Sequence, residues 1–342
     1  MKTLWFNQCF STIYYTIEKF KQMYGDEIKI IGTSTNAEHV FKMACDEFYT
    51  EPDICGDDYY KWAMKFCKEH NIQYFFAKKH RETLSRHINS FKAAGVTVVI
   101  DDYTIQYAFV NKHTVYEKVS KETDKVKIPD YKIAYNPDEF VSIIDEMLYK
   151  YGDGKACYKF DNDEGGGSFR ILSNNVHNDM MYSMPSLAVG HDEAIRQVNL
   201  AAKAGLFKPV MIMEYLAGPE ISCDCYNSKN GFVCTPRRKL NTRQEIIESM
   251  PEVKELCLEL QQIFGFKYPW NVQFRHDTKT GELRLLEINT RLSGGSHLGM
   301  LADAWVGEPL IKDLFGETDY TVQDPKKVIL GRLERHIVME HE

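Results

Sequence analysis

The chain has 342 residues, of which 44% are hydrophobic and 13% aromatic, so it can bury a sizeable core and is not disordered. The formal net charge is −7 and there is no long basic block, which argues against nucleic acid or an anionic membrane as the main partner. The length is enough for about two to three domains.

No segment has the composition of a membrane span or of a secretory signal. A span needs roughly 20 consecutive apolar residues, and no stretch approaches that length. The apolar run at the N-terminus is interrupted early by Asn7, Gln8 and Ser11. We therefore expect a soluble, cytoplasmic protein that does not act on a membrane.

The first 110 residues alternate between short apolar runs and helical patterns. This alternation predicts a parallel sheet with crossover helices. The loop after the first strand reads FNQCFST and has no glycine, which argues against a dinucleotide site of the GxGxxG type. Strands are expected at 3–6, 28–34, 47–49, 72–77 and 96–100, and helices near 11–24, 36–44, 57–70 and 82–94.

The rest of the chain reads as two further parts, after a charged helical stretch at 101–125 and a boundary at Pro129. The expected division is 1–110 for a Rossmann-like domain, 111–213 for a linker helix and small lid, and 214–342 for a C-terminal domain. The lid is predicted to have strands at 131–134, 155–160, 169–172 and 209–213 and helices at 137–150 and 192–203. The C-terminal domain is predicted to have strands near 220–227, 231–235 and 328–339, helices near 251–264 and 297–305, and a hairpin at 271–290.

Nine cysteines are scattered along the chain, an odd number without any CxxC pair. Cys223 and Cys225 are two positions apart, a spacing that suits one face of a strand better than a zinc knuckle. Reduced thiols are the favoured interpretation, and a metal site or a disulfide is the minor alternative.

The hairpin at 271–290 carries the most informative polar pattern. Pairing about a turn at Thr278–Gly281 places Gln273 opposite Glu287. Strand alternation gathers polar side chains on one face and leaves the other face for a core. The polar set is Asn271, Gln273 and Arg275 on the first strand with Glu287, Asn289 and Arg291 on the second, and the core set is Val272, Phe274, Leu286 and Ile288.

Oxygen ligands at this density suit a hard cation such as Mg²⁺, and a neighbouring Arg can stabilise the charge on a transferring phosphoryl group. The alternative is a solvent-facing hairpin, for which Lys and Thr would be more typical than this set of residues.

The segments Asn-Val-Gln-Phe at 271–274 and Glu-Ile-Asn-Thr-Arg at 287–291 resemble the metal-site signature of ATP-grasp enzymes. The resemblance is closest to the large-subunit synthetase domains of carbamoyl-phosphate synthase and to biotin carboxylase, and it covers most of the chain. It implies an α/β protein with an N-terminal Rossmann-like domain, an α+β lid and an α+β ATP domain. It also implies ATP with Mg²⁺ or Mn²⁺, and metal ligands at Gln273, Glu287 and Asn289.

The resemblance extends to residues that bind nucleotide phosphates. Lys112 and Lys159 match the two basic residues that contact the phosphates. Lys159 ends a strand and is followed by a glycine-rich segment, which suits a flap whose backbone amides approach an anion. The flap residues are Gly165, Gly166, Gly167 and Ser168. The alternatives are a solvated helical lysine and an ordinary glycine-rich turn.

A strand at 210–213 leads into Glu214, Tyr215 and Leu216, which match the hinge that holds adenine in the family. Glu220 matches the acidic residue that binds the ribose hydroxyls, with an exposed charge near a turn as the alternative. Alternation places Glu220, Ser222 and Asp224 on one face of its strand, with Ile221, Cys223 and Cys225 on the other.

Candidate substrate ligands come from two places. The basic run Arg237–Lys239, with Arg238 as the selected candidate, can bind a carboxylate or a phosphate, or it can be a solvated loop. Ser293, Gly294 and His297 precede a predicted helix whose first amides can hold an anion.

The resemblance implies an ATP-dependent ligase that activates a carboxylate as an acyl phosphate and passes it to an amine or a thiol, releasing ADP and phosphate. Arg291 and Lys159 are the expected catalytic residues, and catalysis is positioning plus electrostatics. The sequence shows one ATP-grasp unit and no glutaminase segment, so we expect a stand-alone relative of carbamoyl-phosphate synthase rather than a carbamoyl-phosphate producer.

Two other interpretations stay open, a small-molecule kinase that stops at a phosphorylated product and a catalytically inactive nucleotide-binding regulator. A Rossmann oxidoreductase is disfavoured by the missing glycine pattern. The carboxylate and the nucleophile are not identified by the sequence, and neither is the oligomeric state, for which a homodimer is the expectation.

Overall fold

A computed structural model describes residues 1–162, 166–174, 187–333 and 338. The chain forms two compact units. The large unit comprises Met1–Ala108, Ile221–Val272 and Ile288–Glu342, and the small unit comprises Phe109–Glu220 and Gln273–Glu287. The division into three domains at 110 and 213 stays a prediction.

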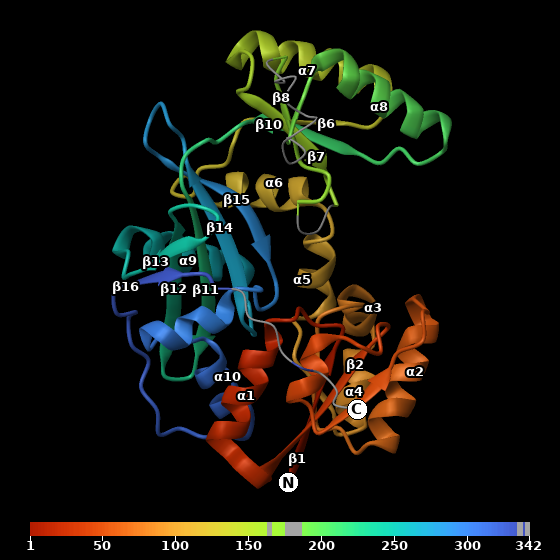
Figure 1. Cartoon of the computed structure of the whole chain (residues 1–342), viewed down its shortest axis with the longest axis vertical. Coiled ribbons are helices and arrows are strands. Elements are labelled where there is room, and N and C mark those ends of the chain that lie inside the picture. Colours follow the sequence, from red (N-terminus) through yellow and green to blue (C-terminus); the bar gives the residue numbers. More distant parts are fainter. Residues whose placement is uncertain (163–165, 175–186, 334–337, 339–342) are drawn as a thin grey trace. The chain divides into compact units, whose positions relative to one another are not determined.

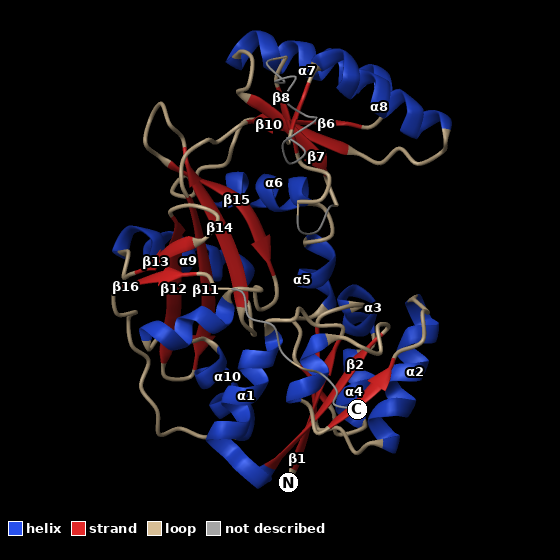
Figure 2. Ribbon diagram, viewed as in Figure 1, coloured by secondary structure: helices blue, strands red, loops and turns tan. Residues whose placement is uncertain are grey.

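The N-terminal part of the large unit is a parallel sheet with strand order β3-β2-β1-β4-β5. Helices cover both faces of this sheet, as the alternation of strands and helices predicts (Figure 2). Its elements are β1 (Lys2–Asn7), α1 (Ile13–Tyr24), β2 (Ile28–Ser34), β3 (Glu47–Thr50), α2 (Gly56–Glu69), β4 (Tyr74–Ala77), α3 (Arg81–Arg86), α4 (Ile88–Ala93), β5 (Thr97–Val98) and α5 (Tyr103–Ala108), with 3₁₀ turns at Gly25–Glu27 and Val40–Ala44.

Alternate aromatic residues of the central strands build the two faces of this sheet. Trp5 stacks on Phe75 with ring centroids 3.6 Å apart, on the face covered by α2, α3 and α4. Phe6 stacks on Phe76 at 4.5 Å on the opposite face, against α1. The core on the α1 face also contains Trp305 from the C-terminal part of the chain, so both parts of the large unit share one core.

The C-terminal half contributes a six-stranded sheet in the order β15-β14-β11-β12-β13-β16 (Figure 1). Its pairings between β11 and β12, β12 and β13, and β13 and β16 are antiparallel. The elements are β11 (Glu220–Ser228), β12 (Gly231–Lys239), β13 (Gln244–Ile247), α9 (Pro251–Phe264), β14 (Trp270–His276), β15 (Leu283–Asn289), a 3₁₀ segment η4 (Ser296–Ala302), α10 (Gly307–Phe315) and β16 (Val328–Gly331).

The small unit has a five-stranded sheet in the order β6-β10-β7-β8-β9. Two helices, α7 and α8, pack on one side of it, with Phe140, Ile144 and Val198 in the shared core (Figure 1). Its elements are α6 (Lys112–Glu122), β6 (Tyr131–Ala134), α7 (Pro137–Tyr151), β7 (Ala156–Phe160), β8 (Arg170–Leu172), β9 (Ala188–Val189), α8 (His191–Lys203) and β10 (Val210–Glu214).

Several predicted elements differ from the structure in length or type. The helix predicted at 82–94 is broken into α3 and α4 at His87, whose ring stacks on Tyr60 of α2 at 3.8 Å. This contact across the fold holds His87 at φ −107°, outside helical geometry.

Near the C-terminus, the helix predicted at 297–305 is a 3₁₀ segment, and α10 follows it unpredicted. The helix predicted at 36–44 is reduced to the 3₁₀ turn Val40–Ala44, and the strand predicted at 328–339 ends at Gly331. Strands β9 and β13, short and of two and four residues, were not predicted.

Candidate active site

The phosphate-binding candidates Lys112 and Lys159 both belong to the small unit, and Asp161 fixes how their elements meet. Asp161 is 2% exposed and lies just after β7. Its carboxylate accepts a hydrogen bond from the His113 backbone N–H (3.0 Å) and contacts the His113 ring at 2.5 Å, and its carbonyl accepts from Lys112 N–H (3.1 Å). A carboxylate at a helix N-terminus satisfies free amides and complements the helix dipole, so it anchors α6 to the end of β7.

Lys159 is a buried lysine whose charge is set by its neighbours. Its side chain rises from β7, and the residue is 6% exposed. Burial lowers its pKa, Glu287 opposes this by raising it, and the positive charge of Lys112 lowers it further. The two lysines and Glu287 are therefore close enough to interact electrostatically inside one unit, an arrangement that favours binding of a polyanion.

Tyr116 fixes the backbone of β15 next to Glu287. It is 1% exposed, lies one turn beyond Lys112 on α6, and donates its phenolic hydrogen to the Leu286 carbonyl at 2.7 Å. The pKa of Tyr116 is raised well above its usual value, first by burial and then by the charge of Glu287. Three elements, α6, β7 and β15, thus meet at Lys112, Lys159 and Glu287.

The hinge residues Glu214, Tyr215 and Leu216 leave β10 in the same unit. The N–H of Glu214 donates to Asp130 at 3.0 Å and that of Tyr215 donates to Lys155 at 2.9 Å. Within residues 1–162, 166–174 and 187–333, no hydrogen bond is made by Leu216 N–H, although this residue is 4% exposed. Buried backbone amides are nearly always paired, so this donor is suited to a ligand atom.

Two arginines brace the hinge from the hairpin. Arg275 donates to the Leu216 carbonyl at 3.0 Å and lies 3.4 Å from the Glu220 carboxylate. Arg284 contacts the Glu214 carboxylate at 3.1 Å. Close approach of the hinge to β14 also requires glycine at 218, because a Cβ there would lie 2.5 Å from the His276 carbonyl oxygen.

Part of the predicted flap is described. Gly165 lies outside the described residues, whereas Gly166, Gly167 and Ser168 lie within them. Gly166 has φ +72°, and the Ser168 hydroxyl accepts from Phe160 N–H at 2.8 Å, which ties the returning flap to β7. The Phe169 ring lies 6.1 Å from that of Tyr215 in the hinge.

The metal-ligand candidates lie on the hairpin, where the boundary between the units falls. Gln273 and Glu287 belong to the small unit, both half-buried, and Asn289 belongs to the large unit. No hydrogen bond or ion pair is made by the Gln273 or Glu287 side chain among the residues that the structure describes. Their role as metal ligands and the pairing of Gln273 with Glu287 stay predictions.

One predicted core position of this hairpin was wrong. Leu286 is only half-buried, whereas the buried positions of β15 are Leu285 and Ile288. These two are three residues apart, which a regular two-residue alternation does not produce. Leu285 N–H donates to the Lys127 carbonyl at 2.8 Å, so β15 has a backbone partner beside this position that its own sequence pattern does not indicate.

The large unit contains a pocket at the carboxyl edge of its parallel sheet. The strand order reverses between β1 and β4, and open α/β sheets bind ligands at such a switch point. Phe10 follows β1 and Lys78 follows β4, and both line the pocket with Arg291 and Ser293 from the segment after β15. Lys78 Nζ lies 4.5 Å and the Arg291 guanidinium 5.0 Å from the centre of the Phe10 ring.

A buried acid organises the loops that form this pocket. Glu51 is 3% exposed, and its carboxylate accepts from Gln8 (2.5 Å) and from the Thr33 hydroxyl (2.5 Å). Gln8 has φ +43°, an uncommon conformation for a residue other than glycine, so these contacts hold the loop that presents Phe10. Burial raises the pKa of Glu51, and the three hydrogen bonds it accepts from Thr33, Gln8 and Tyr59 partly offset this.

The basic run at 237–239 splits between the two faces of β12. Arg238, the selected candidate, pairs with Glu248 at 3.0 Å. Its neighbour Arg237 is 4% exposed and contacts Asp224 (3.1 Å) and the Ser293 hydroxyl (3.0 Å). Arg237 therefore positions the segment that begins at Ser293, and it is already neutralised by acidic partners.

The other predicted substrate residues lie near this segment. A Cβ at Gly294 would lie 3.9 Å from the Phe10 ring. His297 stacks on Tyr15 with ring centroids 4.7 Å apart, and burial, followed by the charge of Arg237, lowers its pKa. The predicted alternation in β11 is confirmed, because Ser222 and Asp224 both bond to Asn271.

Comparison with solved structures shows which fold this is. The biotin carboxylase domain dimer of 2-oxoglutarate carboxylase from Hydrogenobacter thermophilus, solved with MgADP, ADP and bicarbonate, is 16% identical with a TM-score of 0.66, and the match covers 96% of this chain and 73% of that chain. N5-carboxyaminoimidazole synthetase from Staphylococcus aureus, solved with ADP, is 13% identical with a TM-score of 0.69, over 97% and 82%. N5-carboxyaminoimidazole ribonucleotide synthetase from Thermotoga maritima is 11% identical with a TM-score of 0.63, over 96% of this chain and 80% of that chain.

These likenesses show that the chain has the ATP-grasp fold, as the predicted fold class and the resemblance implied. Residues 206–335, less than half of the chain, match the family described as ATP-grasp in the biosynthetic pathway with Ter operon. No curated protein matches the sequence. Among the described residues, no helix is both long and apolar enough to span a membrane.

Proposed function

We propose that this protein is an ATP-dependent ligase that activates a carboxylate as an acyl phosphate and releases ADP and phosphate. The convergence of Lys112, Lys159 and Glu287 in the small unit carries this proposal. A buried lysine that has no carboxylate within ion-pair distance among the described residues costs stability, and a triphosphate supplies the negative charge it lacks.

The nucleotide base and sugar take the hinge. Leu216 N–H is the donor for the edge of adenine, and the Tyr215 and Phe169 rings flank its faces. Glu220, held near Arg275, accepts the ribose hydroxyls. These assignments place all the nucleotide-binding side chains in one unit.

A magnesium or manganese ion fits the oxygen donors of the hairpin. Glu287 and Gln273, without partners of their own among the described residues, and Asn289 from the same strand as Glu287, are the ligands we assign to it. When bound, the ion neutralises charge on the phosphate oxygens.

The acceptor carboxylate binds in the pocket of the large unit. Lys78 and Arg291 supply positive charge beside the Phe10 ring, while Cys9, Ile13 and Phe76 make the rest of the lining largely apolar. This lining favours a carboxylate attached to an apolar or aromatic body over a highly charged substrate.

In the reaction, a carboxylate oxygen attacks the γ-phosphorus and the bond to ADP breaks. Lys159 and Arg291 stabilise the charge on the transferring group. The nucleophile, an amine in the favoured version and a thiol in the alternative, then attacks the acyl carbon. It expels phosphate and loses a proton to solvent.

A screen for ADP release tests the proposal. Purified protein with ATP and Mg²⁺ is given amino acids, aryl and alkyl carboxylates, and bicarbonate, which the Hydrogenobacter carboxylase domain was solved with. At least one carboxylate should stimulate ADP release, and an added amine should increase it further. ADP release that an amine leaves unchanged, with a phosphorylated product, identifies a kinase, and ATP binding without turnover identifies a regulator.

The matched variants are Glu287→Gln and Glu282→Gln, two acids of the same hairpin. Glu287→Gln should abolish ADP release while the fold is retained, and Glu282→Gln, at the exposed turn, should not. Full activity of Glu287→Gln, or release of AMP and pyrophosphate by the wild type, contradicts the scheme.

A further inference from the structure

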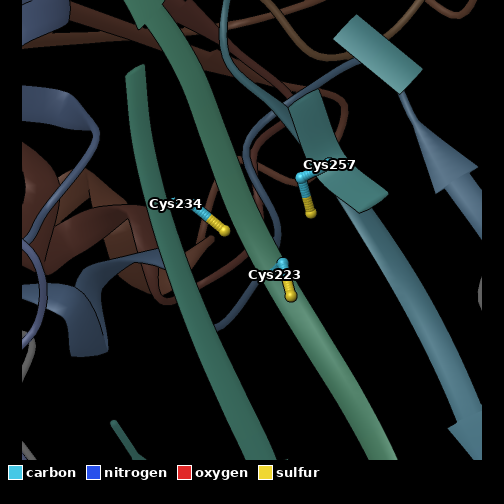
Figure 3. Close-up of side chains that lie close together, drawn as sticks. All are labelled: Cys223, Cys234 and Cys257. Atoms are coloured by element: carbon cyan, nitrogen blue, oxygen red, sulfur yellow. The ribbon is translucent and has the colours of Figure 1, made fainter. Parts of the chain in front are cut away.

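Four cysteines from three elements of the large unit come together in its core. Cys223 and Cys225 lie on β11, Cys234 on β12 and Cys257 on α9. The sulfur atoms of Cys223, Cys234 and Cys257 all lie within 4.8 Å of one another (Figure 3). Cys225 is the direct cross-strand partner of Cys234, and its thiol also interacts with Cys257.

The cluster is closed to solvent. Cys223, Cys225 and Cys257 are fully buried and Cys234 is 3% exposed. The helix residues Val253 and Leu260, one turn before and one turn after Cys257, are also fully buried. The cluster uses the face of β11 opposite to Ser222 and Asp224, so it is separate from the polar network around Arg237.

A buried cysteine by itself is an ordinary small apolar residue. This group differs because sulfurs from two strands and a helix lie together, so each thiol has other thiols as its polar neighbours. Zinc–sulfur bonds of about 2.3 Å in a tetrahedral site separate the sulfurs by roughly 3.8 Å. The observed sulfur–sulfur separations, all within 4.8 Å, are of the same order.

The chemistry of the donors selects the type of metal. Thiolates bind soft or borderline ions such as Zn²⁺ and Cu⁺, whereas Mg²⁺ prefers oxygen. Three cysteines that bind Zn²⁺ as thiolates leave one net negative charge at the site. Lys254, one turn before Cys257 and paired with Asp324 at 2.6 Å, is a cation on the same helix.

We propose that Cys223, Cys234 and Cys257 bind one thiophilic metal ion, Zn²⁺ or Cu⁺, with Cys225 available as a fourth ligand. The ion clamps α9 to β11 and β12 and so stabilises the C-terminal part of the large unit. Its role is structural, because no position of the site opens to solvent or substrate.

Metal analysis of the purified full chain tests this proposal directly. Protein expressed in medium with added Zn²⁺, or with added copper under reducing conditions, is desalted and its metal content measured by mass spectrometry. One ion per chain is expected, in the Zn²⁺ arm or in the copper arm, and the arm that fills identifies the ion. Titration with Cd²⁺ should add an ultraviolet thiolate-to-metal band, and Mg²⁺ should add none.

Two variants give the matched comparison. Cys257→Ser should lose the ion, whereas Cys67→Ser, which changes a buried cysteine on α2, should keep it. The proposal is overturned if the wild type is folded by circular dichroism but holds no stoichiometric ion in either arm and gains no Cd²⁺ band. This holds whatever the stability of the variants. Equal metal content in wild type and folded Cys257→Ser also overturns it, because the ion is then bound elsewhere.

Discussion

Tyr116 donates a hydrogen bond to the Leu286 carbonyl at 2.7 Å, which joins the helix of Lys112 to the strand of Glu287. The two residues are 170 positions apart in the sequence, so this bond exists only in the folded small unit. It links the basic and the acidic sides of the candidate nucleotide site, and it predicts what happens when the hydroxyl is removed.

We expect Tyr116→Phe to lower the free energy of unfolding by about 1 kcal/mol, the typical net value of one buried hydrogen bond. The KM for ATP should rise, because α6 is no longer fixed to β15. Urea unfolding and initial rates of ADP release measure the two effects. Tyr131→Phe is the control, since the Tyr131 ring packs at 5.2 Å from that of Tyr116 and leaves the bond to Leu286 in place.

Asp161 acts through the residues that it positions. Asp161→Asn removes the charge that caps α6 and contacts His113, so the helix end that bears Lys112 should become less well fixed. We expect the KM for ATP to rise about tenfold, equivalent to about 1.4 kcal/mol of binding free energy, while kcat changes little.

The comparison for Asp161 is Asp153→Asn, which alters an exposed acid that bonds to Ser173. Its KM for ATP should match that of the wild type. A fall in kcat of Asp161→Asn with an unchanged KM would mean that Asp161 takes part in the chemical step rather than in positioning Lys112.

Local pattern was enough to predict most strands and the polar face of β11, because alternation is a property of neighbouring residues. It did not predict the role of Asp161, which bonds to His113, 48 residues before it in the sequence. The signal was present, since Asp161 follows Lys159 by two positions, but its partner could be found only in the folded chain.

The pocket in the large unit was missed for the same reason. Phe10 and Lys78 come from loops after β1 and β4, and neither belongs to a recognisable motif. Arg238 was predicted as the substrate ligand in preference to Arg237. The run of three basic residues does not show which of them lies on the face of β12 that contacts Asp224, and in the structure it is Arg237.

Lys78 should contribute to binding of the carboxylate but not of ATP. Lys78→Met removes a positive charge from the pocket beside Phe10 and keeps most of the side-chain length. We expect the KM for the carboxylate found in the screen to rise about tenfold, equivalent to about 1.4 kcal/mol, with the KM for ATP unchanged. Lys79→Met is the neighbouring control, because Lys79 does not line the pocket. A rise in the KM for ATP instead would move Lys78 to the nucleotide site.

The buried charge of Lys159 should lower the stability of the fold while it favours the proposed reaction. Burial lowers its pKa below the usual 10.5, so the folded protein binds that proton less tightly than the unfolded chain. Stability therefore rises with pH between the lowered folded pKa and 10.5, and below that window the buried charge is a cost to the fold.

Lys159→Met should then be more stable than the wild type near neutral pH, with a difference that shrinks as the pH rises through this window. The same change should reduce the rate of ADP release by about 10²–10³-fold, because a charge that stabilises the transferring phosphoryl group is lost. Urea midpoints at several pH values and initial rates measure both, with the exposed Lys155→Met as the control. If Lys159→Met is instead less stable than the wild type at neutral pH, Lys159 stabilises the fold without a nucleotide. In that case its buried charge does not need a bound triphosphate.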